Sequence, residues 1–285
     1  MSVITVTPMV EVNWVDAPMR GVPGTPTYFE HAVEGLRIWQ RVTDTAIVST
    51  RPGNAELYTR LRDSVPGMRI IPGLKTKDLL DRLDSVDGWK AVVREVAAIC
   101  DTSGERVVLI ENEKAVYPFI RGEQSADMDQ LRKALSFLPK DIEYLWYPSI
   151  FGTEKEQMRC AQLCCAVQEV LSSVRFLDQR FQGEQAVCDR WRIAADRRLM
   201  AIAQRPTLRM AYFYGPEYPI TFWRDAQIHV ALRYIRSGSP AHREAVIYPG
   251  VLRWPEAARE LTKRLQSPWS LAGLALRLSD WMGTR

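Results

Sequence analysis

The segment RVVLIENEKAVYP, residues 106–118, joins an apolar run directly to a charged one. Its first part contains four consecutive aliphatic residues, which is typical of a strand buried on both faces. The strand then ends in Glu111, Asn112 and Glu113. A buried strand that ends in two carboxylates predicts a functional position at its end, provided that the fold brings other strand ends to the same place.

Eight such β-rich runs, each followed by a longer amphipathic run, occupy almost the whole chain. Parallel strands need long crossover connections, usually helices, and eight β-then-α units in series close into a barrel. The sequence therefore predicts an α/β fold of the (β/α)8 or TIM-barrel class, as a single domain over residues 1–285 with a C-terminal capping helix at about 268–283. We expect strands at residues 10–15 (or 3–6), 45–50, 68–75, 106–113, 142–150, 174–181, 207–215 and 244–251.

An open, doubly wound sheet is the alternative architecture for this alternation. Sheets of that class usually bind nucleotides at a glycine-rich turn after the first strand. The chain contains neither a GxGxxG nor a GxxxxGK[ST] motif. The closed barrel is therefore the preferred prediction.

The charge of the chain is nearly balanced, with 38 Lys and Arg against 34 Asp and Glu. The basic residues are scattered along the expected helices, whereas nucleic-acid-binding proteins usually carry a clustered basic stripe. No run of about 18 apolar residues occurs, and the N-terminal residues lack the pattern of a signal peptide. We therefore expect no nucleic-acid partner, no membrane partner and a cytoplasmic location, with release by lysis or non-classical export left open. The oligomeric state is not indicated.

The cysteines show no pattern that predicts disulfides or a metal site. Their odd number and irregular spacing do not fit a disulfide framework. No histidine or CxxC motif accompanies them, so we expect buried free thiols, no metal and no other cofactor. The five cysteines are Cys100, Cys160, Cys164, Cys165 and Cys188.

In barrels of this class the active site lies where the strands end and the following loops begin. The histidines (His31, His229 and His242) fall on expected helices or in a helix-to-strand loop, which argues against a barrel metallohydrolase. The sixth expected strand contains no lysine for a Schiff-base aldolase. The turns after the seventh and eighth strands are rich in aromatic residues and proline, unlike the glycine-rich turns of a phosphate site.

Carboxylates and aromatic rings dominate the expected strand ends. This combination is typical of glycoside hydrolysis, in which one acid protonates the leaving oxygen and a second carboxylate, or the substrate's own amide group, stabilises the charged sugar. The candidate catalytic residues are Glu113, Glu111, Asp178 and Glu217. Aromatic rings pack against sugar rings and amides bind hydroxyls, so the candidate substrate-binding residues are Asn13, Trp14, Asn112, Trp146, Tyr147, Gln179, Tyr212, Tyr214 and Tyr248.

The fourth expected strand offers the most specific pair. Side chains alternate along a strand, so Glu111 and Glu113 are expected on the face of Leu109, with Asn112 on the other. If Leu109 fills the barrel, both glutamates point into its mouth. Two close carboxylates favour keeping one of them protonated, as a proton donor requires.

These residues resemble two groups of glycoside hydrolase barrels. Asn112-Glu113 is similar to the Asn-Glu pair that ends the fourth strand in the large retaining clan, which implies Glu113 as acid/base and a nucleophile near Glu217. Glu111-x-Glu113 is similar to the end of the Asp-x-Asp-x-Glu motif of chitinase-like family 18 barrels, and Asp178 matches their sixth-strand aspartate. The resemblance implies a glycosidase with a carbohydrate substrate, in which Asp178 or Glu217 is the partner carboxylate and Glu111 tunes Glu113.

Two other interpretations stay open. One is a non-catalytic barrel that binds carbohydrate or a protein partner. The other is a different barrel chemistry, such as a lyase that uses Lys75 or Lys114.

Overall fold

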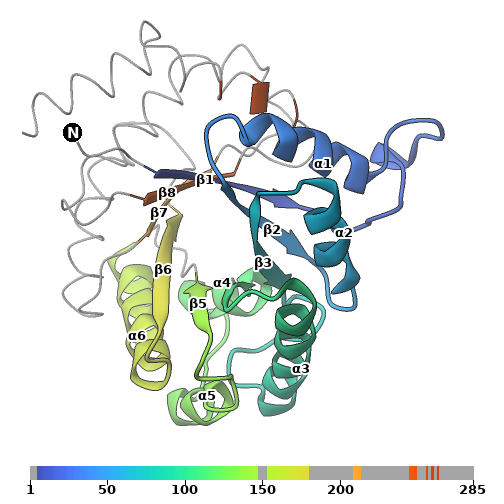
Figure 1. The fold of residues 1–285 in the computed structure, drawn as a ribbon. Coiled ribbons are helices and arrows are strands. Elements are labelled where there is room, and N and C mark those ends of the chain that lie inside the picture. The colour runs from blue at the N-terminus through green and yellow to red at the C-terminus, as the bar shows by residue number, and fades with distance from the viewer. Residues whose placement is uncertain are drawn as a thin grey trace, which may run out of the picture.

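The chain forms a closed barrel of eight parallel strands in sequence order, which confirms the predicted fold class (Figure 1). This computed structural model describes residues 5–146, 153–179, 208–212 and 244–248, together with Pro255, Ala258, Arg259 and Thr262. The strands are β1 (Thr5–Glu11), β2 (Thr45–Thr50), β3 (Arg69–Lys75), β4 (Val107–Glu111), β5 (Glu143–Trp146), β6 (Val174–Gln179), β7 (Leu208–Tyr212) and β8 (Glu244–Tyr248). Pairing of β1 with β8 closes the ring.

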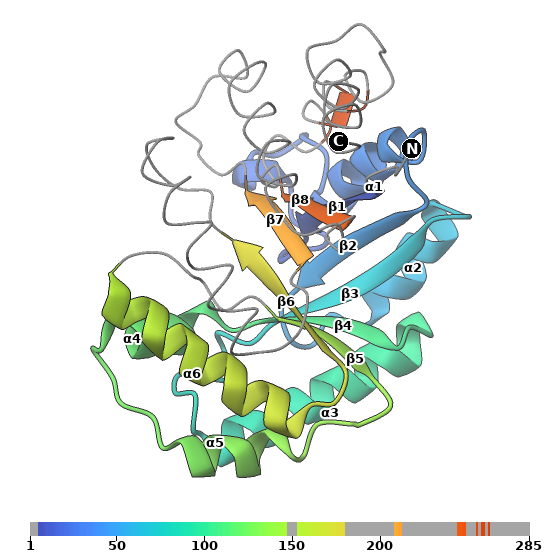
Figure 2. The ribbon, with the colours of Figure 1, turned by 90° about the vertical axis from the view of Figure 1, so that its left-hand side faces the viewer.

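The helices of the described residues lie outside this ring, as two perpendicular views show (Figures 1 and 2). They are α1 (Tyr28–Trp39), α2 (Glu56–Ser64), α3 (Val86–Ser103), α4 (Glu113–Arg121), α5 (Met128–Leu135) and α6 (Glu154–Val170), with a short 3-10 helix, η1 (Met19–Gly21). Among the described residues, no helix has the length and apolar character needed to span a membrane.

Local sequence signals explain several helix boundaries. Helix α1 begins with a capping box, in which the Thr27 side chain accepts from the Glu30 N–H and the Glu30 carboxylate accepts from the Thr27 N–H. Helix α3 ends at Gly104, whose φ of 75° is in the left-handed region that glycine adopts without steric cost. Helix α2 has no side-chain cap, and Asn54, two residues before it, donates to Thr50 Oγ1 at 3.0 Å.

The main core lies between the strands and the helices. It contains outward-pointing residues of β1 to β6, such as Val10 and Val12 within and after β1, and Val108 and Ile110 of β4. Trp89 of α3 is fully buried and stacks on Trp146 of β5, with ring centroids 5.5 Å apart. Because side chains alternate along a strand, the strand residues between those that face the helices line the inside of the barrel.

Two boundaries differ from the predicted ones in a way that matters for the site. Strand β1 ends at Glu11, four residues before the predicted end, so Glu11 is a strand-end residue. Strand β4 ends at Glu111, and Glu113 is the first residue of α4, a helix the periodicity did not indicate. The alternation argument that put Glu111 and Glu113 on one strand face is therefore wrong.

The predicted extent of the domain, residues 1–285, stays a prediction. The expected capping helix at about 268–283 lies outside the described residues.

Candidate active site at the ends of strands 1, 3 and 4

Three charged side chains meet at the carboxyl ends of β1, β3 and β4. Glu11 ends β1, Lys75 ends β3 and Glu111 ends β4. Val10 and Leu74, which directly precede Glu11 and Lys75, belong to the core between the strands and the helices. Glu11, Lys75 and Glu111 therefore point to the barrel interior, at the end where barrels of this class carry their active sites.

The Lys75 ammonium connects the two carboxylates. It forms a hydrogen-bonded ion pair with Oε2 of Glu11, and it lies 3.9 Å from Oε2 of Glu111. The Lys75 and Glu11 side chains are each 16% exposed, and that of Glu111 is 4% exposed. Asn13 adds a hydrogen bond from Nδ2 to the same oxygen of Glu11, at 3.3 Å. We call Glu11, Lys75 and Glu111 the carboxylate–lysine cluster.

The cluster holds an amino group close to two carboxyl groups in a partly dehydrated site, where charges interact more strongly than in water. Such a cluster supplies both a cation that can stabilise a developing oxyanion and a carboxylate that can accept a proton.

Two small residues leave room for Lys75 to reach across to β1. Ser49 and Gly73 are paired in register, between Glu11 on one side and Leu109 on the other. A Cβ atom on Gly73 would lie 2.8 Å from the Cβ atom of Ser49, so any larger residue would require the two strands to shift apart. The side chains of β2 and β3 at this level of the barrel interior are therefore small and leave space beneath the lysine side chain.

Tyr58 of α2 holds β2 and β3 together at the same level. Its hydroxyl lies 3.0 Å from the carbonyl oxygen of Val48 and 2.9 Å from that of Gly73, and it accepts the Gly73 N–H at 3.2 Å. Complete burial, with a further contribution from the negative charge of Glu111, raises the pKa of Tyr58 far above its ordinary value. Tyr58 therefore remains a protonated structural group.

The loops after β1 and β2 bring further polar groups to the rim of the barrel. The guanidinium carbon of Arg51 lies 4.5 Å from the centre of the Trp14 ring, and Trp14 is 49% exposed. Asn54 joins the two loops through Thr50 Oγ1, which itself donates to the carbonyl of Val12 at 2.6 Å. Hydrogen bonds thus connect the loops after β1 and β2, and the two loops place Arg51 beside Trp14.

Several buried polar atoms near the cluster have no hydrogen-bond partner in the described part of the chain. They include Ser49 Oγ, Asn13 Oδ1 and both side-chain polar atoms of Asn112. A buried polar group without a partner costs on the order of 1–3 kcal/mol, and such groups are typical of sites that a ligand or water completes. No group of three or more His, Cys, Asp or Glu side chains in the described residues could hold a metal ion.

Among the predicted catalytic residues, Glu111 is the one whose side chain the structure describes. Glu111 lies in the carboxylate–lysine cluster, whereas Glu113 belongs to α4. The backbone of Asp178 pairs with that of Arg209 inside the sheet. Glu217 lies outside the described residues.

The predicted substrate-binding residues are divided between the barrel mouth and other positions. Asn13 and Trp14 follow β1 at the mouth, and Asn112 is the buried N-cap residue of α4. Trp146 lies on the helix side of β5, stacked on Trp89. Gln179, Tyr212 and Tyr248 are the last residues of β6, β7 and β8, and the Tyr212 and Tyr248 backbones are paired in register. Tyr147 and Tyr214 lie outside the described residues.

Sequence reasoning missed Glu11 and gave Lys75 no partner. The available signal was the alternation Val10-Glu11-Val12, which places one charged residue between two apolar ones on a strand buried by helices. Placing the strand end at residue 15 concealed that signal, because Glu11 then fell inside the strand.

Comparison with known proteins supports the fold and identifies no family. No protein-family model matches the sequence, and no curated protein matches it. A Toxoplasma gondii ME49 protein described as a "putative deoxyribose-phosphate aldolase" has a similar structure, with a TM-score of 0.54, 12% identity, and coverage of 90% of this chain and 93% of the other. A second structure of that name, in the apo form, gives a TM-score of 0.54, 11% identity, and coverage of 90% and 95%.

These findings correct the expected glycoside hydrolase. The similar barrels are named for aldolase chemistry and not for glycoside hydrolysis. The geometry agrees, because Glu111 is bound to a lysine ammonium and does not share a strand face with Glu113. The predicted resemblance to glycoside hydrolases, the glycosidase activity and the role of Glu113 as the acid of a glutamate pair on β4 are therefore not retained.

Proposed function

We propose that the chain is an enzyme that catalyses proton transfer next to a carbonyl group, with aldol cleavage or its reverse as the net reaction. One observation carries the proposal. An ammonium lies between two carboxylates at the active-site end of a (β/α)8 barrel, in a site that is partly but not fully closed to solvent. A cation and a base held this close are what the formation of an enolate requires.

Lys75 is the electrophilic group in this proposal. A substrate carbonyl oxygen that accepts a hydrogen bond from the Lys75 ammonium gains stabilisation as negative charge develops on it. The Lys75 side chain is better suited to this role than to direct attack on the carbonyl, because it is already engaged in an ion pair with Glu11, whereas a Schiff base requires the neutral amine. The reaction therefore proceeds without a covalent intermediate on Lys75.

Glu11 is the base, and Glu111 is a positioning residue. The Glu11 side chain is more exposed than that of Glu111, 16% against 4%, so a substrate reaches it more readily. Asn13 orients the Glu11 carboxylate through its hydrogen bond. Glu111 lies deeper, 3.9 Å from the Lys75 Nζ, and helps to position the lysine.

The bond changes balance without another reactant. Glu11 removes the proton of a hydroxyl on the carbon β to the carbonyl, and the electrons of that O–H bond form a new C=O bond. The bond between the α and β carbons breaks, and its electron pair forms the enolate, whose oxygen is stabilised by Lys75. The proton held by Glu11 then returns to the α carbon, which leaves both carboxylates and the ammonium as they began.

The similarity to the Toxoplasma gondii protein is consistent with this reaction class. Its name refers to an aldolase, and the barrel it shares with this chain is the scaffold on which the cluster is built. The support from that comparison concerns the scaffold, since the identity is 12%.

The direct test is exchange of carbon-bound hydrogen with solvent. Acetaldehyde, pyruvate, dihydroxyacetone and dihydroxyacetone phosphate are each incubated with the protein in D2O, and loss of the α-proton signal is followed by NMR. We expect the wild type to accelerate exchange of at least one compound, and Lys75→Met to lose about 100-fold or more of that rate, as is typical when an oxyanion-stabilising group is removed. Glu11→Gln should lose activity as well.

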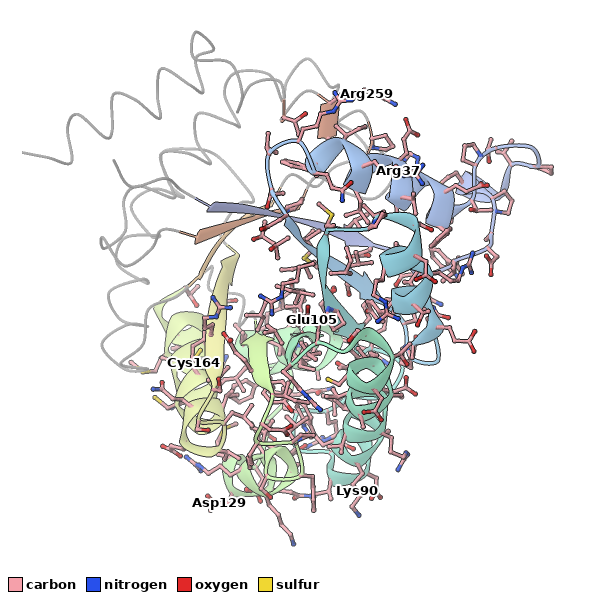
Figure 3. The ribbon with its side chains drawn as sticks, viewed as in Figure 1. Arg37, Lys90, Glu105, Asp129, Cys164 and Arg259 are labelled. Atoms are coloured by element: carbon pink, nitrogen blue, oxygen red, sulfur yellow. The ribbon has the colours of Figure 1, made fainter. Side chains whose placement is uncertain are left out.

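Lys90→Met is the matched control. Lys90 also pairs with a carboxylate, that of Asp87 at 3.3 Å, but it lies on α3 at the outside of the molecule (Figure 3). Its removal should leave exchange unchanged. Equal rates for the wild type and Lys75→Met would refute the role of Lys75, and no exchange of any compound by the wild type would favour a barrel that binds without catalysis.

Borohydride separates the proposed route from a Schiff base. If Lys75 acts through its ammonium, reduction in the presence of an active compound leaves the protein mass unchanged. A mass increase that is lost in Lys75→Met would show covalent catalysis and contradict the non-covalent step.

A further inference from the structure

Arg51 is a cation at the rim of the barrel that the proposed reaction does not use. It follows β2 directly and is half-buried. Within the described residues it forms no ion pair, and its buried Nε has no hydrogen-bond acceptor. A partly buried guanidinium without a carboxylate is unusual, because burying such a charge is costly unless it is paired.

The position of Arg51 relative to Lys75 follows from the strand register. Thr50 and Leu74 are paired between β2 and β3, and Arg51 and Lys75 are the next residues of the two strands. Neighbouring strands are about 4.8 Å apart, so the backbones of the two cations are adjacent. A small molecule that contacts the Lys75 ammonium is therefore within reach of the long Arg51 side chain.

Trp14 determines how Arg51 presents its hydrogen-bond donors. The guanidinium lies over the indole ring, with its carbon 4.5 Å from the ring centroid. Stacking on an aromatic face leaves the N–H groups at the edge of the guanidinium plane directed away from the ring. That edge matches the two oxygens of a carboxylate or phosphate, which it binds through parallel hydrogen bonds.

We infer that Arg51, supported by Trp14, binds an anionic group of the ligand while the carboxylate–lysine cluster receives its carbonyl. The inferred substrate is thus a small carbonyl compound that carries a carboxylate or a phosphate. The role of the carbonyl rests on the proposed function, whereas the anion site rests on Arg51 and Trp14 alone. Ser49, two residues before Arg51 and paired in register with Gly73, has a buried Oγ without a partner in the described structure.

The test measures anion binding without turnover. Thermal unfolding midpoints of the wild type are followed against increasing inorganic phosphate, and separately acetate, at an ionic strength held constant with sodium chloride. A bound anion stabilises the folded protein in a saturable way that yields a Kd. The same titrations are made on Arg51→Gln, Arg51→Lys and Lys75→Met, with circular dichroism to verify that each variant is folded.

Arg60→Gln is the matched control. Arg60 also lies over an aromatic ring, that of Phe29 at 4.2 Å, but it is paired with Asp16 at 2.9 Å. Both arginines are near the same side of the barrel, so the control removes one positive charge and one stacked cation without removing the proposed site. General effects of phosphate on protein stability should be the same in all variants.

The inference predicts saturable binding of one or both anions by the wild type, Arg60→Gln and Lys75→Met. Arg51→Gln should weaken it about tenfold or more, as loss of a charged bidentate partner does, and Arg51→Lys should be intermediate. The anion that saturates at the lower concentration identifies the group as phosphate or carboxylate.

Three results would overturn the inference: no saturable binding by the wild type, equal affinity in Arg51→Gln, or loss of binding in Lys75→Met with retention in Arg51→Gln. The two proposals fail separately. Binding that depends on Arg51, without any proton exchange, would preserve the anion site and remove the proposed reaction. Exchange that depends on Lys75, without Arg51-dependent binding, would do the opposite.

Discussion

Gly73→Ala tests the close approach of β2 and β3 beneath the cluster. The added Cβ would lie 2.8 Å from Cβ, 3.0 Å from Cα and 3.1 Å from Oγ of Ser49. Carbon atoms that touch normally lie about 3.5–4.0 Å apart, so the two strands must separate locally by several tenths of an ångström. Overpacking of this kind costs about 1–3 kcal/mol. The smaller unfolded-state entropy of alanine returns about 0.4–1 kcal/mol, and we expect a net loss of about 1–2 kcal/mol.

Chemical denaturation of four proteins measures this effect: the wild type, Gly73→Ala, Ser49→Gly and the double variant. Ser49→Gly removes the Cβ and Oγ atoms of that residue but keeps its backbone in place, so it should relieve part of the strain. By itself it should cost about 0.5–1 kcal/mol, as glycine does within a strand. The double variant should then be more stable than the sum of the two single changes by about 1 kcal/mol, the coupling expected of neighbouring residues that touch.

A result for Gly73→Ala within about 0.5 kcal/mol of the wild type, the usual range for changes without a packing effect, would refute the reasoning. So would strict additivity of the two changes, because it would show that Ser49 is not the residue displaced. The same variants connect packing to the site. Since Lys75 is two residues beyond Gly73, Gly73→Ala should also lower the rate of proton exchange, and Ser49→Gly should restore part of it.

Two substitutions and one labelling experiment test further groups around the barrel. Tyr58→Phe removes the hydroxyl that bonds both polar backbone groups of Gly73 and should cost about 1–3 kcal/mol in urea unfolding; an unchanged midpoint would contradict its structural role. Burial raises the pKa of Asp84, but hydrogen bonds from Arg82 and a backbone N–H outweigh it and hold that pKa below 3.8. Asp84→Ala should therefore cost about 1.5–3 kcal/mol at neutral pH, and the difference from the wild type should shrink only as the pH falls below about 4; a constant difference down to about pH 2 would contradict this. Burial raises the pKa of Cys100 to about 11, so iodoacetamide at about pH 8, near the ordinary thiol pKa, should not label it in the folded protein, and rapid labelling detected by mass spectrometry would refute its burial.

The barrel could be predicted because its signal is repeated along the chain. Strand β2 was predicted at residues 45–50, as the structure has it, because a β-rich run is bounded by turn residues on both sides. The predicted end of β4 was wrong because Glu113 fits the alternating pattern of a strand in the sequence, whereas in the structure it is the first residue of α4. Asn112 leaves the strand conformation there, with φ −123° and ψ 32°, and a helix follows immediately.

The site was harder to predict because it depends on interactions across the barrel. Glu11 and Glu111 are separated by 100 positions in the sequence, and no local pattern shows that Lys75 lies between them. The absence of a lysine from the sixth expected strand was used to argue against aldolase chemistry. That argument considered one strand, whereas Lys75 ends β3 and reaches β1 over Ser49 and Gly73.

The carboxylate–lysine cluster has a consequence for how the protein can diversify. Its three members all belong to the first four strands, and Arg51 and Trp14 are also in that half of the sequence. Substitutions confined to the second half of the sequence leave each of these residues unchanged. If the proposed reaction is correct, the first half of the chain can therefore keep its chemistry while the second half diverges in sequence.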